Sequence, residues 1–395
     1  MATLNERSKQ ARLEKQRIRR RIAFIVGAVV GVAAIICAVL FVMEAIRTKT
    51  YTGYETLNSY ERNDSNTVQY KYYKGNLLKY SRDGASGIDD SGNAFWNGSY
   101  DMKEPIIADC GEYVAVADMG GKEVYVFNGK DAGTTVLMTY PIADLKVAGQ
   151  GVVAVVLEDN ASNIIQLYDP YATGEKLLAE IPTNVADDGY PVDIALSKDG
   201  KSIITSYINV NGGSLCSNVC FYNFSEVGQD KNRMVGGSPY DDKLVSKLEF
   251  CGNDTVCIMF DKGFAIYSNM KQPKLVHEEF FEEEIVSVVN SDMYVGFVFA
   301  KASEDGNYNM IVYDLKGSKV LEKSISGQYE NINIYGDEII LYNDMSCKII
   351  RIDGSEKFNY KFEAGIEYFI KADGKNNYYI IDSTYVNKVR LTEDK

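Results

Sequence analysis

The sequence predicts an all-β protein, a β-propeller of eight four-stranded blades preceded by one N-terminal transmembrane α-helix. The main evidence is a short apolar strand with a polar turn, clearest in M-I-V-Y-D-L-K-G (residues 310–317), which recurs at spacings of 39 to 54 residues. A recurrence of about 40 to 45 residues with several strands per unit is typical of propeller blades. Heavy use of Tyr, 29 copies, also favours half-buried strands. Aligned on the residue before the turn, the copies are Ile88, Phe127, Tyr168, Tyr222, Tyr267, Tyr313, Ile352 and Leu391.

Each repeat is interpreted as four strands that run from the propeller axis outward. Second strands such as V-V-A-V-V-L (residues 152–157) are apolar on both sides, as expected for a blade packed between two neighbours. The last repeat ends at its third strand, at Leu391. Because an open ring leaves an exposed edge, residues 55–62 are predicted to supply the missing outer strand and close the ring. Seven blades is the alternative, if the first or the last repeat is not a blade.

The repeat around Tyr222 is the longest. Its extra residues fall in N-V-N-G-G-S-L-C-S (residues 209–217) and in residues 228–242, both rich in Gly, Asn and Asp. These segments are predicted to be extended loops, and loops on a rigid scaffold often carry binding sites. Function is therefore expected in these loops and in the central funnel.

The N-terminal part of the chain carries a predicted membrane span at residues 22–43. These 22 residues contain no charge, and as a helix they can cross about 30 Å of hydrocarbon. The positive-inside rule places the preceding basic residues in the cytoplasm and the rest outside. The predicted parts are a cytoplasmic tail (1–21), the span (22–43), a short linker (44–50) and an extracytoplasmic propeller (51–395). The orienting residues are Arg17, Arg19, Arg20 and Arg21.

A cleaved signal peptide is the competing interpretation of the same pattern. The apolar run is too long for one, and no small-x-small cleavage site follows it. We therefore predict an uncleaved signal anchor in the cell membrane, as a single pass. Gly27 and Gly31 form a G-x-x-x-G pair, a pattern found in dimers of membrane helices, so a weak homodimer through this pair is a further expectation.

Charge is distributed unevenly along the chain. The net charge is −13, but residues 1–21 carry +6 and residues 44–50 carry +1, which leaves −20 on residues 51–395. A domain this acidic repels nucleic acid and anionic lipid, so no nucleic-acid partner is expected.

Few residues support a catalytic or metal site. His277 is the only histidine and lies in the acidic run H-E-E-F-F-E-E-E, which is typical of a solvated outer strand. No zinc spacing or calcium loop is present, so neither a metal nor a cofactor is predicted. Cys251 and Cys257 bracket a plausible hairpin, C-G-N-D-T-V-C, and are a candidate disulfide in an exported domain. Trp96 is expected to pack in an outer strand. Paired carboxylates stay open as catalytic candidates.

Two family resemblances follow from particular segments. G-A-S-G-I-D-D-S-G-N-A-F-W (residues 84–96) resembles the quinoprotein-type (PQQ-like) consensus, and the repeats are similar to WD40-like propellers. No other repeat keeps the Trp, so this resemblance implies at most a degenerate quinoprotein. The basic tail, the single span and Y-K-G-N-L-L-K-Y-S-R-D-G-A-S (residues 73–86) together resemble a family of uncharacterised membrane-anchored propellers of clostridia-type Gram-positive bacteria, described as a domain of unknown function.

The favoured functional hypothesis is a non-enzymatic binding or scaffolding module for envelope proteins or polymers, displayed outside the membrane. One alternative is a carboxylate-based glycan hydrolase or lyase, or a degenerate quinoprotein. Another is a ligand sensor, in which the propeller binds a ligand and the cytoplasmic tail reports it.

Overall fold

The computed structural model describes residues 24, 31–39, 48–65, 67–159, 162–211, 213–300 and 307–393. The chain divides into two compact units, Met1–Thr50 and Tyr51–Lys395. In the first unit, residues 31–39 are helical, and no helix among the described residues is long and apolar enough to span a bilayer. Most of the predicted span lies outside the described residues, as do Gly27 and the four orienting arginines.

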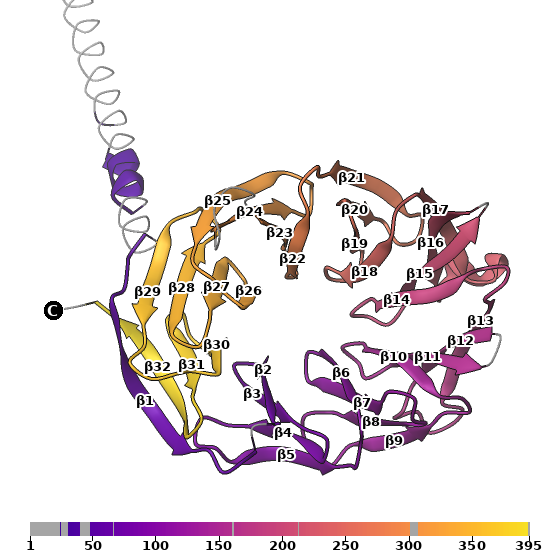
Figure 1. Cartoon of the computed structure of the whole chain (residues 1–395), viewed down its shortest axis with the longest axis horizontal. Coiled ribbons are helices and arrows are strands. Elements are labelled where there is room, and N and C mark those ends of the chain that lie inside the picture. Colours follow the sequence, from indigo (N-terminus) through magenta and orange to yellow (C-terminus); the bar gives the residue numbers. More distant parts are fainter. Residues whose placement is uncertain are drawn as a thin grey trace, which may run out of the picture. The chain divides into compact units, whose positions relative to one another are not determined.

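The second unit is a β-propeller of eight four-stranded antiparallel blades around a central axis (Figure 1). The seven-blade alternative is therefore wrong. The first strands, nearest the axis, are β2 (Gln69–Tyr73), β6 (Pro105–Cys110), β10 (Ile142–Val147), β14 (Tyr190–Leu196), β18 (Val245–Phe250), β22 (Ile285–Asn290), β26 (Asn331–Tyr335) and β30 (Tyr368–Lys371). The second strands are β3 (Asn76–Tyr80), β7 (Tyr113–Asp118), β11 (Val153–Asp159), β15 (Ser202–Asn211), β19 (Thr255–Phe260), β23 (Tyr294–Ala300), β27 (Glu338–Tyr342) and β31 (Asn377–Ile381).

The outer half of each blade consists of its third and fourth strands. The third strands are β4 (Gly84–Ile88), β8 (Glu123–Phe127), β12 (Ser162–Tyr168), β16 (Ser214–Asn223), β20 (Gly263–Ser268), β24 (Asn307–Asp314), β28 (Ser346–Arg351) and β32 (Tyr385–Thr392). The fourth strands are β5 (Ala94–Ser99), β9 (Thr134–Leu137), β13 (Leu177–Asn184), β17 (Met234–Asp241), β21 (Lys274–Phe280), β25 (Lys319–Ser326), β29 (Glu356–Lys361) and β1 (Gly53–Glu61). A 3-10 helix, η1 (Glu226–Lys231), connects β16 to β17.

The ring is closed by the N-terminal strand, as predicted. β1 pairs antiparallel with β32, from Gly53 opposite Thr392 to Glu61 opposite Tyr385, so blade 8 contains both ends of the propeller unit (Figure 1). Tyr51, just before β1, also donates its backbone N–H to Lys357 O of blade 7 at 2.8 Å. The N-terminal segment that closes the ring therefore contacts blade 7 through Tyr51 and blade 8 through β1.

The hydrophobic core is a ring of eight apolar layers, each between two neighbouring blades. The residue that aligns the repeats packs in every blade against the blade before it. Phe127 of blade 2, for example, lies in the layer shared with blade 1, and Tyr313 of blade 6 lies in the layer shared with blade 5. This position recurs because each blade needs a large side chain there to fill the wedge to its neighbour.

Second strands contribute to the layers on both of their sides. In β11, Val153 and Val155 pack toward blade 2, whereas Ala154 and Val156 pack toward blade 4. Side chains of a strand alternate between its two faces, so a strand buried on both faces must be continuously apolar.

The turn after the third strand explains the polar end of the repeat. In blade 6, the Asp314 carboxylate accepts backbone N–H bonds from Lys316 (2.9 Å) and Ser318 (2.8 Å). Gly317 has a φ of 81°, which favours glycine. Asp followed by Gly thus serves the turn geometry here.

The long segments of blade 4 are a correction to the sequence prediction. Residues 209–217, predicted as a loop, lie mostly in a long hairpin in which β15 and β16 have ten residues each. Residues 228–242 form η1 and β17. Their Gly and Asn residues suggested loops, but the pairing of β15 with β16 continues to Asn211 opposite Ser214, the last pair of the hairpin. Tertiary pairing outweighs local propensity here.

Candidate functional site

The first strands surround a funnel at the axis, with a cavity of about 720 Å³. Its wall comes from β2, β6, β10, β14 and β18. Gly111, Lys198 and Asp292 also line it, and all three belong to turns between first and second strands. The funnel therefore opens on the face where these turns lie.

Strand alternation places charged residues in this funnel. In β10, Asp144 and Lys146 alternate with Leu145 and Val147, which pack in the layer between blades 2 and 3. The same alternation in β18 directs Glu249 to the funnel. The alternation of charged and apolar residues is visible in the sequence, in D-L-K-V (residues 144–147) and K-L-E-F (residues 247–250). Only the closed ring shows that the charged faces of these strands line a common space.

The charges in the funnel form pairs of opposite sign, some within one strand and others between blades. The Lys146 Nζ atom lies 3.1 Å from an Asp144 carboxylate oxygen and 3.3 Å from one of Asp193. Lys198 Nζ lies 2.5 Å from the Asp292 carboxylate at the rim. Further pairs join Lys71 to Asp109 and Lys247 to Glu249. The funnel thus presents donors and acceptors together rather than one sign of charge.

Burial and pairing shift the protonation equilibria of these groups. Burial alone would lower the pKa of Lys146, but the carboxylates of Asp144 and Asp193 outweigh it and raise that pKa. Burial raises the pKa of Glu249, although nearby lysines oppose the shift. Burial also raises the pKa of the Cys110 thiol, so this residue is protonated at neutral pH and is a poor nucleophile. The arrangement is suited to binding polar groups.

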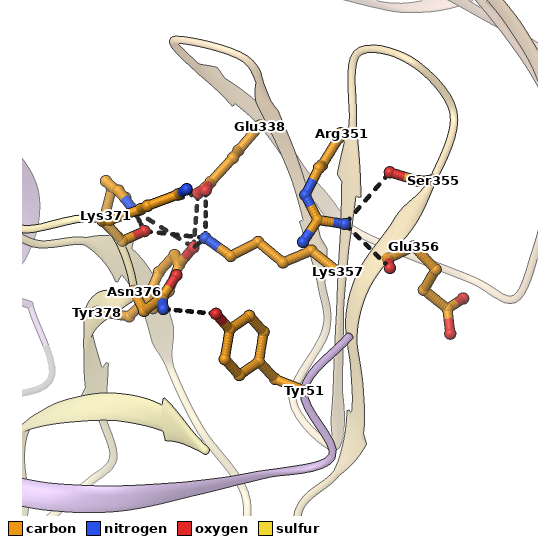
Figure 2. A network of polar contacts seen from close by, with 10 residues as sticks. Tyr51, Glu338, Arg351, Ser355, Glu356, Lys357, Lys371, Asn376 and Tyr378 are labelled. Atoms are coloured by element: carbon orange, nitrogen blue, oxygen red, sulfur yellow. Dashed lines mark hydrogen bonds and ion pairs between the residues drawn. The ribbon is translucent and has the colours of Figure 1, made fainter. Parts of the chain in front are cut away.

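A second polar cluster lies in the seam between blades 7 and 8 (Figure 2). Lys357 of β29 is 1% exposed, and its ammonium contacts the Glu338 carboxylate of β27. It also donates to Lys375 O at 2.9 Å and to the Tyr378 hydroxyl at 3.0 Å. Lys371 of β30 contacts the same carboxylate at 3.2 Å. The donors that contact the Glu338 carboxylate, namely Lys357, Lys371 and Tyr378, all belong to this cluster. We therefore interpret the cluster as a structural contact that holds the two blades together.

The seam also includes the start of the closing strand. Asn376, in the turn between β30 and β31, donates its side-chain amide to the Tyr51 hydroxyl at 2.7 Å (Figure 2). On the other side, Arg351 donates to Ser355 Oγ and to Glu356 O, both at 3.2 Å. The seam therefore connects the chain's entry into the propeller with blades 7 and 8.

We expect the seam to make stability depend on pH above neutrality. Burial lowers the pKa of Lys357 to about 8 in the folded protein, although Glu338 opposes this shift, whereas an unfolded lysine titrates near 10.5. Between these values the unfolded chain binds the extra proton, so this lysine's contribution to the free energy of unfolding rises as pH increases from about 8 to 10. Urea unfolding of the natural protein and of Lys357→Met across this range should show a difference in the free energy of unfolding that changes with pH. A difference that is the same at every pH would contradict the lowered pKa of Lys357.

Other residues singled out in the sequence occupy structural positions. Trp96 is buried in the outer strand β5 and stacks on Phe127 with ring centroids 4.9 Å apart, as expected for a packing residue. His277 lies in the outer strand β21, away from the funnel lining, beside Glu279 at 3.2 Å. Among the described residues, no group of three or more His, Cys, Asp or Glu is placed to hold a metal ion.

The candidate disulfide residues lie close together in blade 5. Cys251 and Cys257 are both buried, and their Sγ atoms are 3.7 Å apart as free thiols. A disulfide needs an S–S distance of about 2.05 Å. The pairing of these two cysteines stays a prediction.

Comparison with known proteins assigns the chain to a family. The model of a family of unknown function (DUF5711) matches residues 47–391, nearly the whole propeller unit. The chain belongs to this family. No curated protein matches the chain.

Solved structures similar to this family member share the propeller fold. BamB from Moraxella catarrhalis is 12% identical with a TM-score of 0.50, and the match covers 86% of this chain and 100% of BamB. A eukaryotic initiation factor is 14% identical with a TM-score of 0.53, over 84% of each chain. Sqt1 from Saccharomyces cerevisiae is 11% identical with a TM-score of 0.52, over 87% of this chain and all of Sqt1. At these identities the likeness shows the fold alone.

Proposed function

We propose that this DUF5711 chain is a binding or scaffolding module whose funnel receives a polar segment of a protein or polymer of the cell envelope. The observation that carries this proposal is the funnel itself. It has a volume of about 720 Å³ and is lined by lysine–carboxylate pairs on strands that belong to a closed ring. A rigid wall of this kind orders few groups on binding, which lowers the entropic cost of association.

The proposed partner carries both donors and acceptors, because each funnel lysine already has a carboxylate beside it. A purely anionic polymer is disfavoured by the −20 charge of residues 51–395, the remainder of the chain's −13. A polypeptide segment, with peptide groups and mixed side chains, matches this wall better than a polyanion does.

The same proposal includes a single-pass anchor at residues 22–43, with the propeller outside the cell and the arginine-rich tail inside. The uncharged run and the basic residues before it support this arrangement. Dimerisation through Gly27 and Gly31 and an origin in clostridia-type bacteria stay predictions.

Site-specific photo-cross-linking tests the funnel. A photoreactive residue at Lys198, on the funnel rim, should capture a defined partner several-fold more strongly than one at Lys319. Lys319 is a fair control because it lies on the outer strand β25 with similar side-chain exposure, 47% against 42%, and a similar ion pair. Equal capture from both positions would show that the funnel is not the binding surface.

A further inference from the structure

The charges that line the funnel do not cancel. Among the described residues, three lysines and four carboxylates line the cavity, which leaves one negative charge without a lysine. The lysines are Lys71, Lys146 and Lys198, and the carboxylates are Asp109, Asp144, Glu249 and Asp292. Two further residues that contact this set, Asp193 and Lys247, cancel each other. The wall is therefore mixed in sign but acidic by one charge.

The uncompensated charge can be assigned to Glu249. The other three lining carboxylates each accept a hydrogen bond from a lysine, in the pairs Lys71 with Asp109, Lys146 with Asp144 and Lys198 with Asp292. Glu249 makes no hydrogen bond among the described residues, and its nearest cation, Lys247 Nζ, lies 3.9 Å from one carboxylate oxygen. Lys247 instead donates to the Asn290 side-chain oxygen at 2.9 Å. The Glu249 carboxylate is thus left open toward the cavity.

The strand that carries Glu249 holds it in place. Leu248 and Phe250, its neighbours in β18, are 2% and 7% exposed and pack in the layer between blades 4 and 5. The Glu249 side chain is 39% exposed, so an incoming group can reach its carboxylate. Burial nevertheless raises the pKa of Glu249, which means that the charged form lacks solvation that a bound cation can replace. A fixed strand therefore presents a poorly solvated carboxylate to the funnel.

The geometry of this acceptor favours one kind of cation. A guanidinium group places two N–H donors side by side and pairs with both oxygens of a carboxylate. Glu249 suits this arrangement, because neither of its oxygens has a donor within hydrogen-bond distance among the described residues. Tyr72 also lines the cavity and is 36% exposed, and guanidinium groups stack on aromatic rings of this kind. We propose that Glu249 binds an arginine side chain of the polypeptide segment that enters the funnel.

This assignment rests on the proposed function, because the arginine belongs to the segment that the funnel receives. A lysine side chain gains the same charge attraction but offers a single point of contact to the carboxylate. An acidic side chain meets a wall that already has an excess of negative charge. The segment is therefore basic, with arginine preferred over lysine.

Four blocked pentapeptides, titrated into the full-length protein in detergent under saturation-transfer NMR, test the preference. They share the sequence Gly-Ser-X-Ser-Gly, in which X is arginine, citrulline, lysine or glutamate. Citrulline has the shape of arginine without its charge. We expect the arginine peptide to bind at least about tenfold more tightly than the citrulline and glutamate peptides, with lysine between them. Absence of binding by all four peptides, or equal binding of the arginine and citrulline peptides, would overturn the assignment.

Glu249→Gln should remove the preference for arginine over citrulline, because glutamine keeps the size of glutamate without its charge. Circular dichroism should show a folded protein, since the carboxylate makes no hydrogen bond that the substitution would break. Glu322→Gln is the matched control. It makes the same change in net charge on the outer strand β25, away from the funnel lining, and should keep the preference. Equal loss in both variants would show that net charge alone is responsible.

The photo-cross-link from Lys198 distinguishes a failure of this assignment from a failure of the proposed function. Mass spectrometry of the captured partner should find an arginine within a few residues of the attachment point. A captured segment without an arginine there would overturn the role of Glu249 and leave the proposed function standing. Equal capture from Lys198 and Lys319 would overturn both.

Discussion

Glu338→Gln should lower the free energy of unfolding by about 3–5 kcal/mol, as expected when one member of a buried ion cluster is removed. Glu338 is the shared counter-charge of Lys357 and Lys371 in the seam between blades 7 and 8. Without it, the pKa of Lys357, which burial already lowers to about 8, falls further, and the lysine must either lose its proton or stay charged and unpaired near Lys371, both of which cost stability. Urea unfolding at pH 7, followed by tyrosine fluorescence, measures the change.

Two further variants separate the lost charge from general damage. Glu322→Gln is the matched control, because Glu322 pairs with Lys319 on an exposed surface and its loss should change stability by no more than about 0.5 kcal/mol. The double variant Glu338→Leu with Lys357→Met removes both charges and should regain part of the loss. If Glu338→Gln behaved like Glu322→Gln, the seam would not hold the blades together.

Removal of residues 1–62 should abolish cooperative folding of the propeller, whereas removal of residues 1–50 should leave it intact. The longer truncation deletes β1 and leaves β32 as an exposed edge in an open ring. It also deletes Arg62, a buried residue that pairs with Asp64 and with Glu367 of blade 8. The shorter truncation stops at the boundary between the two compact units.

Calorimetry and size-exclusion chromatography distinguish these outcomes. The chain without residues 1–50 should show one cooperative transition and elute as a folded species. The chain without residues 1–62 should aggregate or lose that transition, and a synthetic peptide of residues 51–62 should restore it in part. A melting temperature within a few degrees for both truncations would show that β1 is dispensable for closure.

The blade repeat could be predicted because one residue per repeat has the same task in every blade. A large side chain before the turn fills the layer toward the preceding blade, and Asp with Gly then builds the turn, as Asp314 and Gly317 do in blade 6. Such local requirements leave a periodic trace in the sequence. The closing strand was predicted by a related argument, because a propeller whose last blade lacks one strand must recruit it from elsewhere.

The long strands of blade 4 could not be predicted from composition. The Gly and Asn residues near Asn211 favour turns when considered locally, but β15 and β16, of ten residues each, stay paired with one another as far as Asn211 opposite Ser214.

By itself, the sequence determined the four-stranded blade and its strand order, predicted the closure of the ring and favoured eight blades over seven, because each depends on contacts that the repeats make in the same way. The tertiary structure alone decided which side chains meet in the funnel and in the seam. Glu338, Lys357, Lys371 and Tyr378 come from four different strands of two blades. Their association depends on how neighbouring sheets face each other, and the alternation within one strand says only which residues share a face.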